Sequence, residues 1–386
     1  AQSVKWTVTG NPEANFPSLD RAMQLTAPGG YVYVAGIKTN DKGNSAIELK
    51  MLNPEGKELV NVLSGETMQS VPYSNTPNKL LRDINGYIYL IGTEYIDDFW
   101  GYEVVLTKYD ALLNLQWQRV CYTSSDFADE PVDAVIDAEN SIIVAGYMHG
   151  ENYNNHKIFI RKYDAAGELL YVASPENNGE AKYLALCGLL TDAVGNIYAG
   201  GTAESSFRGK RMFLIKLNKE GSQVWKRFAD ATNEALNDEA NAICFDKAGN
   251  ICIAGTTETG MYKAKNYVAK FDISGHKISD EVFANGNAAK EGVWKIISDD
   301  KGSLFAIAYA ANDKQMNEQF TIYKLSPSTQ PRIINQMKGR VEDVAISKSG
   351  CVWLTGSLNN RQGFVYRICG SSAKLLYADI ESPDRK

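Results

Sequence analysis

The sequence contains few of the residues that most often carry catalysis, metal binding or covalent cross-links. Its 386 residues include three histidines and six cysteines, and no two cysteines form a CxxC pair. The cysteines are too few and too scattered for a disulfide framework, and no zinc or redox motif is present. Basic residues do not outnumber acidic ones, 40 against 46, which gives a net charge of -6. This balance argues against nucleic acid and anionic membrane surfaces as partners.

Long hydrophobic runs and helical patterns are missing as well. The longest apolar runs, such as Ile142–Gly146, are far shorter than the roughly 20 residues that cross a bilayer, so we expect no membrane-spanning segment. No window shows sustained apolar periodicity at i, i+3, i+4 and i+7. With 44% hydrophobic and 22% charged residues, the chain is not disordered. The sequence therefore predicts a folded protein built from strands.

A short apolar segment that ends in a small residue recurs along the whole chain. The copies end at Gly36, Gly92, Gly146, Gly201, Gly255, Ala308 and Gly356, at intervals of 56, 54, 55, 54, 53 and 48 residues. A basic residue followed by an apolar one recurs in phase, and from Lys108 to Lys324 its spacing is 54 residues four times in succession. Two markers that share one period predict seven structural units.

Each unit divides into short segments rich in Val, Ile, Tyr and Phe, separated by clusters of Gly, Asn and Asp, which is typical of strands and tight turns. In the fourth unit the predicted strands are 183–190, 197–201, 212–217 and 223–228. The strands are nearly continuous apolar runs, so we expect both faces of each sheet to be buried between neighbouring sheets.

Four antiparallel strands repeated seven times predict an all-β fold, a seven-bladed β-propeller in which each sheet covers the next. We expect one domain over 1–386 and a monomer. The units are centred on 19–66, 77–122, 131–175, 183–229, 239–284, 292–338 and 340–380. Independent domains of this size would each have too small a core.

The repeat resembles the SBBP type of bacterial β-propeller repeat. The segments that carry the resemblance are DAVGNIYAGG at 192–201, MFLIKLNKEGSQVW at 212–225 and FDKAGNICIAG at 245–255. The resemblance covers all seven units, more weakly in the first, sixth and seventh. It implies a propeller in a bacterial, often exported, setting and implies no particular reaction. The start AQSVKW, directly before a strand pattern, also favours an extracytoplasmic protein, in the periplasm or at the cell surface.

Closure of a propeller requires its last blade to be completed, because an open sheet edge invites aggregation. The segment Val4–Gly10 matches the fourth strand of a unit, and we expect this closing strand, 3–10 in its widest bounds, to pair into the last blade. The segment Lys374–Ile380 competes for the same place. The sequence leaves both alternatives open.

The connections after the second and fourth strands of each unit are longer and more varied than the others. In a four-stranded meander both sets emerge on one face, the long-loop face, where we expect any binding site. Its aromatic rings would stack on sugars or cover neighbouring blades, and its polar groups would form hydrogen bonds. The candidate residues on this face are Asp97, Asp98, Trp100, His149, Tyr153, His156, Phe207, Arg208 and Tyr262.

A second candidate site is the central funnel, where the innermost strand of each unit begins. An acidic ring there would hold a cation, or its members would be solvated or paired with basic groups. The candidate funnel residues are Asp20, Glu130, Asp133, Glu239, Asn241, Arg340 and Asp343. No calcium-loop, P-loop, GxSxG or dinucleotide motif supports a cofactor, so we expect no metal and no cofactor.

Cys244 and Cys252 flank one tight turn, so they are either a cross-strand disulfide or two buried thiols. We expect the remaining cysteines to be small core residues. They are Cys121, Cys187, Cys351 and Cys369.

The favoured function is a non-catalytic binding or scaffolding propeller that recognises a glycan, peptide or protein through the long-loop face. The alternative is a glycan-active hydrolase or lyase, or a metal-dependent lactonase, with carboxylates in the funnel. Two carboxyl groups at a fixed separation in space would favour the hydrolase over the non-catalytic binding protein.

Overall fold

The computed structural model describes the chain in segments that together hold most of its strands. The described residues are 23–26, 31–39, 45–53, 57–64, 76–96, 101–121, 129–148, 157–175, 183–205, 209–231, 237–260, 263–284, 290–311, 319–326, 329–338, 340–346, 351–358, 362–369 and 372–378. All helical or strand structure in these segments is β-strand. No helix long and apolar enough to cross a membrane occurs in the described part of the chain.

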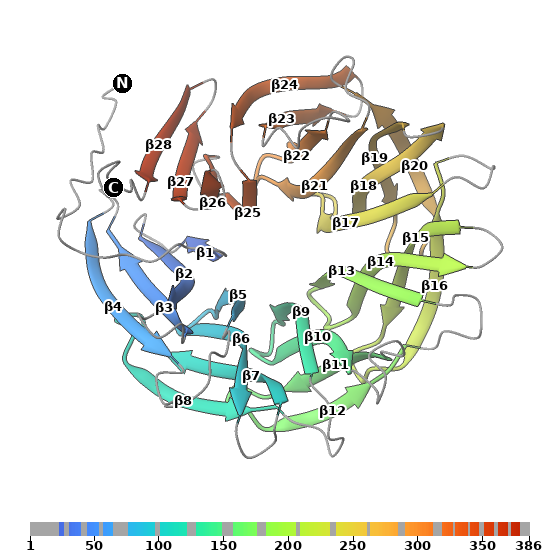
Figure 1. The fold of residues 1–386 in the computed structure, drawn as a ribbon. Helices are drawn as coiled ribbons and strands as arrows, with labels where there is room; N and C mark the ends of the chain where they lie inside the picture. The colour runs from blue at the N-terminus through green and yellow to red at the C-terminus, as the bar shows by residue number, and fades with distance from the viewer. Residues whose placement is uncertain are drawn as a thin grey trace. The chain divides into compact units, whose positions relative to one another are not determined.

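The chain divides into two compact units, which are described separately. One comprises Ala1–Glu130 with Gly339–Lys386, and the other Pro131–Lys338. In both, consecutive strands pair as antiparallel meanders of four (Figure 1).

The first compact unit contains three four-stranded meanders. The first is β1 (Met23–Thr26), β2 (Val32–Thr39), β3 (Ser45–Leu52) and β4 (Glu58–Ser64). The second is β5 (Thr76–Arg82), β6 (Ile88–Ile96), β7 (Gly101–Tyr109) and β8 (Leu115–Val120). The third is β25 (Arg340–Ile346), β26 (Val352–Leu358), β27 (Gln362–Cys369) and β28 (Ser372–Ala378).

The last of these meanders bears on the two alternatives for the closing strand. β28 pairs with β27 and holds the fourth place, so the C-terminal alternative supplies that strand. The segment Val4–Gly10 lies outside the described residues. Among the described residues, β28 thus takes the fourth place in this meander.

The second compact unit continues the pattern. Its first meander is β9 (Asp129–Ile136), β10 (Ile142–Met148), β11 (Lys157–Tyr163) and β12 (Leu169–Ala173). The next is β13 (Tyr183–Thr191), β14 (Ile197–Ser205), β15 (Gly209–Leu217) and β16 (Gln223–Ala229).

An eight-stranded sheet follows in the same unit. It comprises β17 (Asp238–Phe245), β18 (Ile251–Gly260), β19 (Lys263–Phe271) and β20 (Lys277–Phe283), then β21 (Lys290–Ser298), β22 (Leu304–Ala311), β23 (Gln319–Ser326) and β24 (Thr329–Lys338). The two halves are joined by one parallel residue pair, Ala264 with Lys290. Each half is therefore a meander like the others.

The turns between paired strands share one geometry. In the turn that follows β13, Asp192 Oδ1 accepts the backbone N–H groups of Val194 and Asn196 at 3.1 and 2.9 Å, and Gly195 adopts a φ of +86°. An aspartate at this place satisfies backbone donors that a tight turn leaves unpaired, and glycine at the fourth position takes the left-handed conformation without strain. The same turn follows β17, where the aspartate is Asp246 and the glycine is Gly249.

The core lies between neighbouring meanders and is built from their middle strands. In β10 and β11 most side chains are buried, whereas the outer strand β12 exposes Leu169, Leu170 and Val172. The expectation that both faces are buried thus holds for these middle strands and is wrong for this outer strand, whose exposed side chains show that the neighbouring meanders do not cover it fully.

The first strand of several meanders carries a β-bulge that the sequence pattern did not predict. In β17 the register shifts between Ala240 and Ala242, which leaves Asn241 as the extra residue. The bulge moves the backbone toward the neighbouring strand: a Cβ on Gly255 would lie 1.8 Å from the carbonyl oxygen of Glu239. This close approach explains why the repeated apolar segment ends in glycine there.

The cysteines differ from expectation at one position. Cys121, Cys187, Cys244 and Cys252 are free thiols. Cys351 is buried, as expected, but it is disulfide-bonded. A buried thiol becomes a bridge when a second sulfur lies opposite it, and linear spacing does not show this.

Candidate functional site

The residues predicted on the long-loop face all lie outside the described residues. They are Asp97, Asp98, Trp100, His149, Tyr153, His156, Phe207, Arg208 and Tyr262. The structure does describe the strand ends on either side of their loops. The candidate site is therefore built from these strand ends.

Two predicted funnel residues hold neighbouring meanders together. Asp133 on β9 accepts the N–H groups of Ala134 and of Leu189 on β13, each at 2.9 Å. Asn241, the bulged residue of β17, donates from Nδ2 to the carbonyl oxygen of Val293 on β21 at 2.8 Å. Each polar side chain thus binds the backbone of the first strand in the next meander.

The other funnel candidates do not share one arrangement. Glu239 pairs with Lys210 of β15, while Asp343 accepts the N–H of Val344 at 2.9 Å. Glu130 is exposed, and Arg340 is described only as the first residue of β25. Asp20 lies outside the described residues. No group of three or more His, Cys, Asp or Glu side chains suited to a metal ion occurs within the described ranges.

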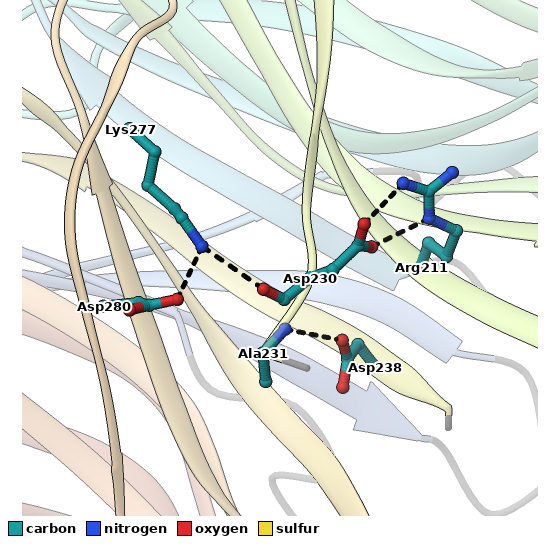
Figure 2. A network of polar contacts seen from close by, with 6 residues as sticks. All are labelled: Arg211, Asp230, Ala231, Asp238, Lys277 and Asp280. Carbon is teal, nitrogen blue, oxygen red and sulfur yellow. Dashed lines mark hydrogen bonds and ion pairs between the residues drawn. The ribbon is translucent and has the colours of Figure 1, made fainter. Parts of the chain in front are cut away.

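A polar network lies where the β13–β16 meander meets the β17–β20 meander (Figure 2). The Arg211 guanidinium on β15 makes a two-pronged contact with Asp230, and its Nε lies 2.8 Å from Asp230 Oδ1. Lys277 of β20 lies between the meanders: its Nζ is 2.6 Å from Asp280 Oδ2 and 3.4 Å from the Asp230 carbonyl oxygen. A bidentate arginine–carboxylate pair fixes orientation as well as position.

The network also fixes both ends of the connection between β16 and β17. Asp238 Oδ2 accepts the N–H of Ala231 at 3.0 Å, which closes the loop across 232–236. Asp238 is buried, and burial raises the pKa of its carboxyl group. The two residues that flank this connection, Ala231 and Asp238, are therefore held together by a hydrogen bond.

The neighbouring hairpin ends are bound to the same base. Asn237 Oδ1 accepts the N–H of Lys210 at the start of β15, and its Nδ2 donates to Glu258 Oε2 near the end of β18, at 3.0 and 2.7 Å. Three connections, 206–208, 232–236 and 261–262, thus start from one hydrogen-bonded rim, which we call the β14–β19 rim. Two of them carry Phe207, Arg208 and Tyr262 of the predicted site.

The charged groups of this rim have polar partners. Lys210 pairs with Glu239, Arg211 with Asp230 and Lys277 with Asp280, while Asp238 accepts from the N–H of Ala231 and Glu258 from Asn237. These contacts fix the strand ends from which the three connections start. Sequence reasoning missed the rim because its partners come from strands far apart in the chain.

A second polar cluster lies in the other compact unit, at the base of the β6–β7 hairpin. Glu94 and Glu103 are opposite one another across these strands, and both are buried. Glu94 Oε1 accepts from Ser64 Oγ at 3.1 Å and from Gln118 Nε2 at 3.4 Å. Burial raises the pKa of Glu94, an effect that its hydrogen bond to Ser64 opposes. The sequence does contain a sign of this pair: Glu94 and Glu103 lie at equal distances before and after the segment with Asp97, Asp98 and Trp100, as cross-strand partners in a hairpin do.

Comparison with known proteins identifies the fold. No protein-family model matches the chain, and no curated protein is significantly similar in sequence. Among solved structures, the β-propeller domain of the Trilobed protease from Pyrococcus furiosus is similar over 94% of this chain and 96% of that domain, with a TM-score of 0.59 and 9% sequence identity.

Two hydrolytic proteins and a protein assembly also contain similar structures. A puromycin hydrolase matches all of this chain over 57% of its own, with a TM-score of 0.60 and 14% identity. The Pyrococcus horikoshii acylaminoacyl peptidase matches 94% of this chain over 52% of its own, with a TM-score of 0.56 and 9% identity. A chain in the structure of the mitotic checkpoint complex matches 94% of this chain over 95% of its own, at a TM-score of 0.52 and 10% identity. The fold of this protein is a β-propeller.

Proposed function

We propose that this protein is a seven-bladed β-propeller that binds a glycan, peptide or protein through its long-loop face without catalysing a reaction. In this proposal β17–β20 and β21–β24 are two separate blades, because only one residue pair joins these two halves of the eight-stranded sheet in the described residues. The resulting blade count agrees with the seven-fold repeat in the sequence.

The β14–β19 rim is the observation that carries the proposal. Hydrogen bonds of Asn237 and Asp238 connect the bases of three loops, and the Arg211–Asp230 pair stiffens them. Loops on a preorganised base lose less conformational entropy when they bind. Phe207, Arg208 and Tyr262 supply aromatic surface and a planar cation on those loops.

Binding assays with purified protein test this function. A glycan array and an immobilised peptide library are probed with the wild-type chain and with Phe207→Ala and Tyr262→Ala variants. We expect binding that weakens at least tenfold in each variant. Leu112→Ala, an exposed side chain in the short turn after β7 and outside that face, is the control and keeps wild-type binding. Equal binding by all four proteins would place recognition elsewhere.

The glutamate pair under the β6–β7 loop favours a second candidate, a glycan-active hydrolase. Two buried carboxyl groups, one with a raised pKa, are the elements of acid–base cleavage of glycosidic bonds. This candidate requires turnover of a chromogenic glycoside or polysaccharide that falls at least a hundredfold in both Glu94→Gln and Glu103→Gln. Binding without turnover supports the first proposal over this one.

An extracytoplasmic location is part of the proposal. Disulfides persist in oxidising compartments and are rare in a reducing cytoplasm, and Cys351 is disulfide-bonded. The resemblance to exported bacterial repeats supports the same location.

A further inference from the structure

Cys244 and Cys252 form a thiol pair that no part of the proposed function uses. They lie directly opposite one another on β17 and β18, so their side chains share one face of the sheet. Both are free and buried, with exposed fractions of 9% and 0%. A hydrogen bond with Cys252, followed by burial, raises the pKa of the Cys244 thiol. The two thiol groups are therefore neighbours on one face of the β17–β18 ladder.

The register places this pair where a bond between the sulfurs fits. Asp246 N–H donates to the Asn250 carbonyl oxygen at 2.8 Å at the turn, and Cys244 with Cys252 is two residue pairs further along the ladder. Hydrogen-bonded pairs alternate along an antiparallel ladder, so this pair is again a hydrogen-bonded one, with a Cα separation of about 5.5 Å. Disulfides span Cα separations of about 4.4–6.8 Å, which includes this one, but they bring the Cβ atoms to about 3.5–4.5 Å, whereas the Cβ atoms of a hydrogen-bonded pair lie nearer about 5.5 Å apart. Closure therefore draws the two strands slightly together and gives a strained, readily reduced bond.

A cation lies beside the pair. Lys270 is opposite Cys252 on the next strand, β19, and its Nζ is 2.8 Å from Asp246 Oδ2. At Cys244 the ammonium group lowers the thiol pKa and the nearby Asp246 carboxylate raises it, both in addition to the larger effects of the Cys252 hydrogen bond and of burial. A thiolate is the species that attacks a disulfide.

We propose that Cys244 and Cys252 are a reversible redox modification site that closes to a cross-strand disulfide. The Cys244 thiolate attacks a low-molecular-weight disulfide, forms a mixed disulfide and releases one thiolate. Cys252 loses its proton and displaces the second thiolate, which closes the bond. Two electrons pass to the external disulfide, which leaves as two thiols once protonated.

Thiol trapping tests the proposal. The folded protein is equilibrated with mixtures of reduced and oxidised glutathione, alkylated in denaturant and mapped by peptide mass. We expect the peptides of Cys244 and Cys252 to lose alkylation together and to appear as one linked species. Dithiothreitol restores both. Two cysteines that stay alkylated at the most oxidising ratio would overturn the proposal.

Two single variants separate pairing from general thiol reactivity. In Cys252→Ala the linked species is lost, and Cys244 stops at one glutathione adduct. Cys187→Ala, which removes a free thiol outside the pair, closes like the wild type. If Cys252→Ala does not fold, Cys244→Ala provides the same comparison. Equal oxidation of Cys121, Cys187 and the pair would contradict a specific site.

Discussion

Glycines in the turns adopt positive φ angles, and the effect of each on the free energy of unfolding can be measured by substitution. Gly249 has a φ of +80°, and a Cβ there would meet nothing within 4 Å. We expect Gly249→Ala to cost about 1–2 kcal/mol of unfolding free energy, because only the left-handed conformation is strained. Denaturant unfolding measures this loss.

Gly195 is the matched comparison at the equivalent turn. Its φ is +86°, but its Cβ would lie 3.2 Å from Lys219 Cβ. Gly195→Ala should therefore destabilise more than Gly249→Ala. An alanine at Gly249 that leaves the stability unchanged would show that the turn relaxes to another conformation.

Glu94 gives a residue-level prediction about pH. Burial raises its pKa above the ordinary 4.5, so its contribution to stability is complete below that value and is lost as pH rises through the folded-state pKa. Glu94→Gln keeps an acceptor for Ser64 and does not titrate. The variant should gain stability relative to wild type between about pH 4 and about pH 8. Denaturant midpoints at both pH values check this, and a constant difference would contradict it.

At the scale of single strands, the residue opposite the repeated lysine on the neighbouring strand determines which group the lysine binds. Ile143 and Cys252 are opposite Lys162 and Lys270, and each lysine pairs with its turn aspartate at 2.8 Å. In the β13–β16 meander, Tyr198 is opposite Lys216 and donates to Asp192 Oδ2 at 3.0 Å instead. The lysine then binds the carbonyl oxygen of Ile273 in the next meander. A tyrosine opposite the lysine therefore replaces it as the hydrogen-bond partner of the turn aspartate.

Removal of that hydroxyl tests the exchange. Tyr198→Phe should lower the unfolding free energy by about 1 kcal/mol, since one buried hydrogen bond is lost. Tyr171→Phe is the control, because the buried Tyr171 hydroxyl has no hydrogen-bond partner among the described residues. Denaturant unfolding should show a loss in the first variant and little change in the second. Equal losses would mean that the rings, and not the hydroxyl, set the stability.

The sequence predicted the existence and type of these strands better than their ends. For the β13–β16 meander it predicted strands at 197–201 and 212–217, whereas β14 and β15 span Ile197–Ser205 and Gly209–Leu217. The ladder continues through Glu204 opposite Lys210, where the polar residues hide the strand pattern. The bulges were missed for a similar reason: an extra residue such as Asn241 changes the register without changing the apolar segment.

At the scale of the whole molecule, periodicity was sufficient for the propeller fold, because each meander repeats the same apolar segments and turns. The candidate site was harder to predict. Asp133 and Asn241 have the composition of a ligand site, but they bind backbone groups of the next meander. The Asp238 contacts that build the β14–β19 rim form only when the strand ends lie close together in the fold, and the sequence pattern does not show which strand ends do so.

The Cys351 disulfide gives a prediction for the whole fold. Loss of a native disulfide typically costs about 2–5 kcal/mol, so reductant should lower the melting temperature of the wild type. In a Cys244→Ala background, which removes the other redox-active pair, Cys351→Ala should melt lower without reductant and show no further change with it. Calorimetry measures both, and non-reducing peptide mapping identifies the partner cysteine. A reductant effect that persists in the variant would contradict this assignment.

Four contacts between successive meanders share one direction. Asp133, Tyr147, Thr202 and Asn241 are side chains of the earlier meander, and each binds a main-chain group of the following one, at Leu189, Leu186, Ala240 and Val293. A main-chain group is the same whichever amino acid carries it. At these four contacts the later copy can change its residues without loss of the bond, whereas Asn237, Asp238 and Lys277 bind backward to the earlier copy and must be kept.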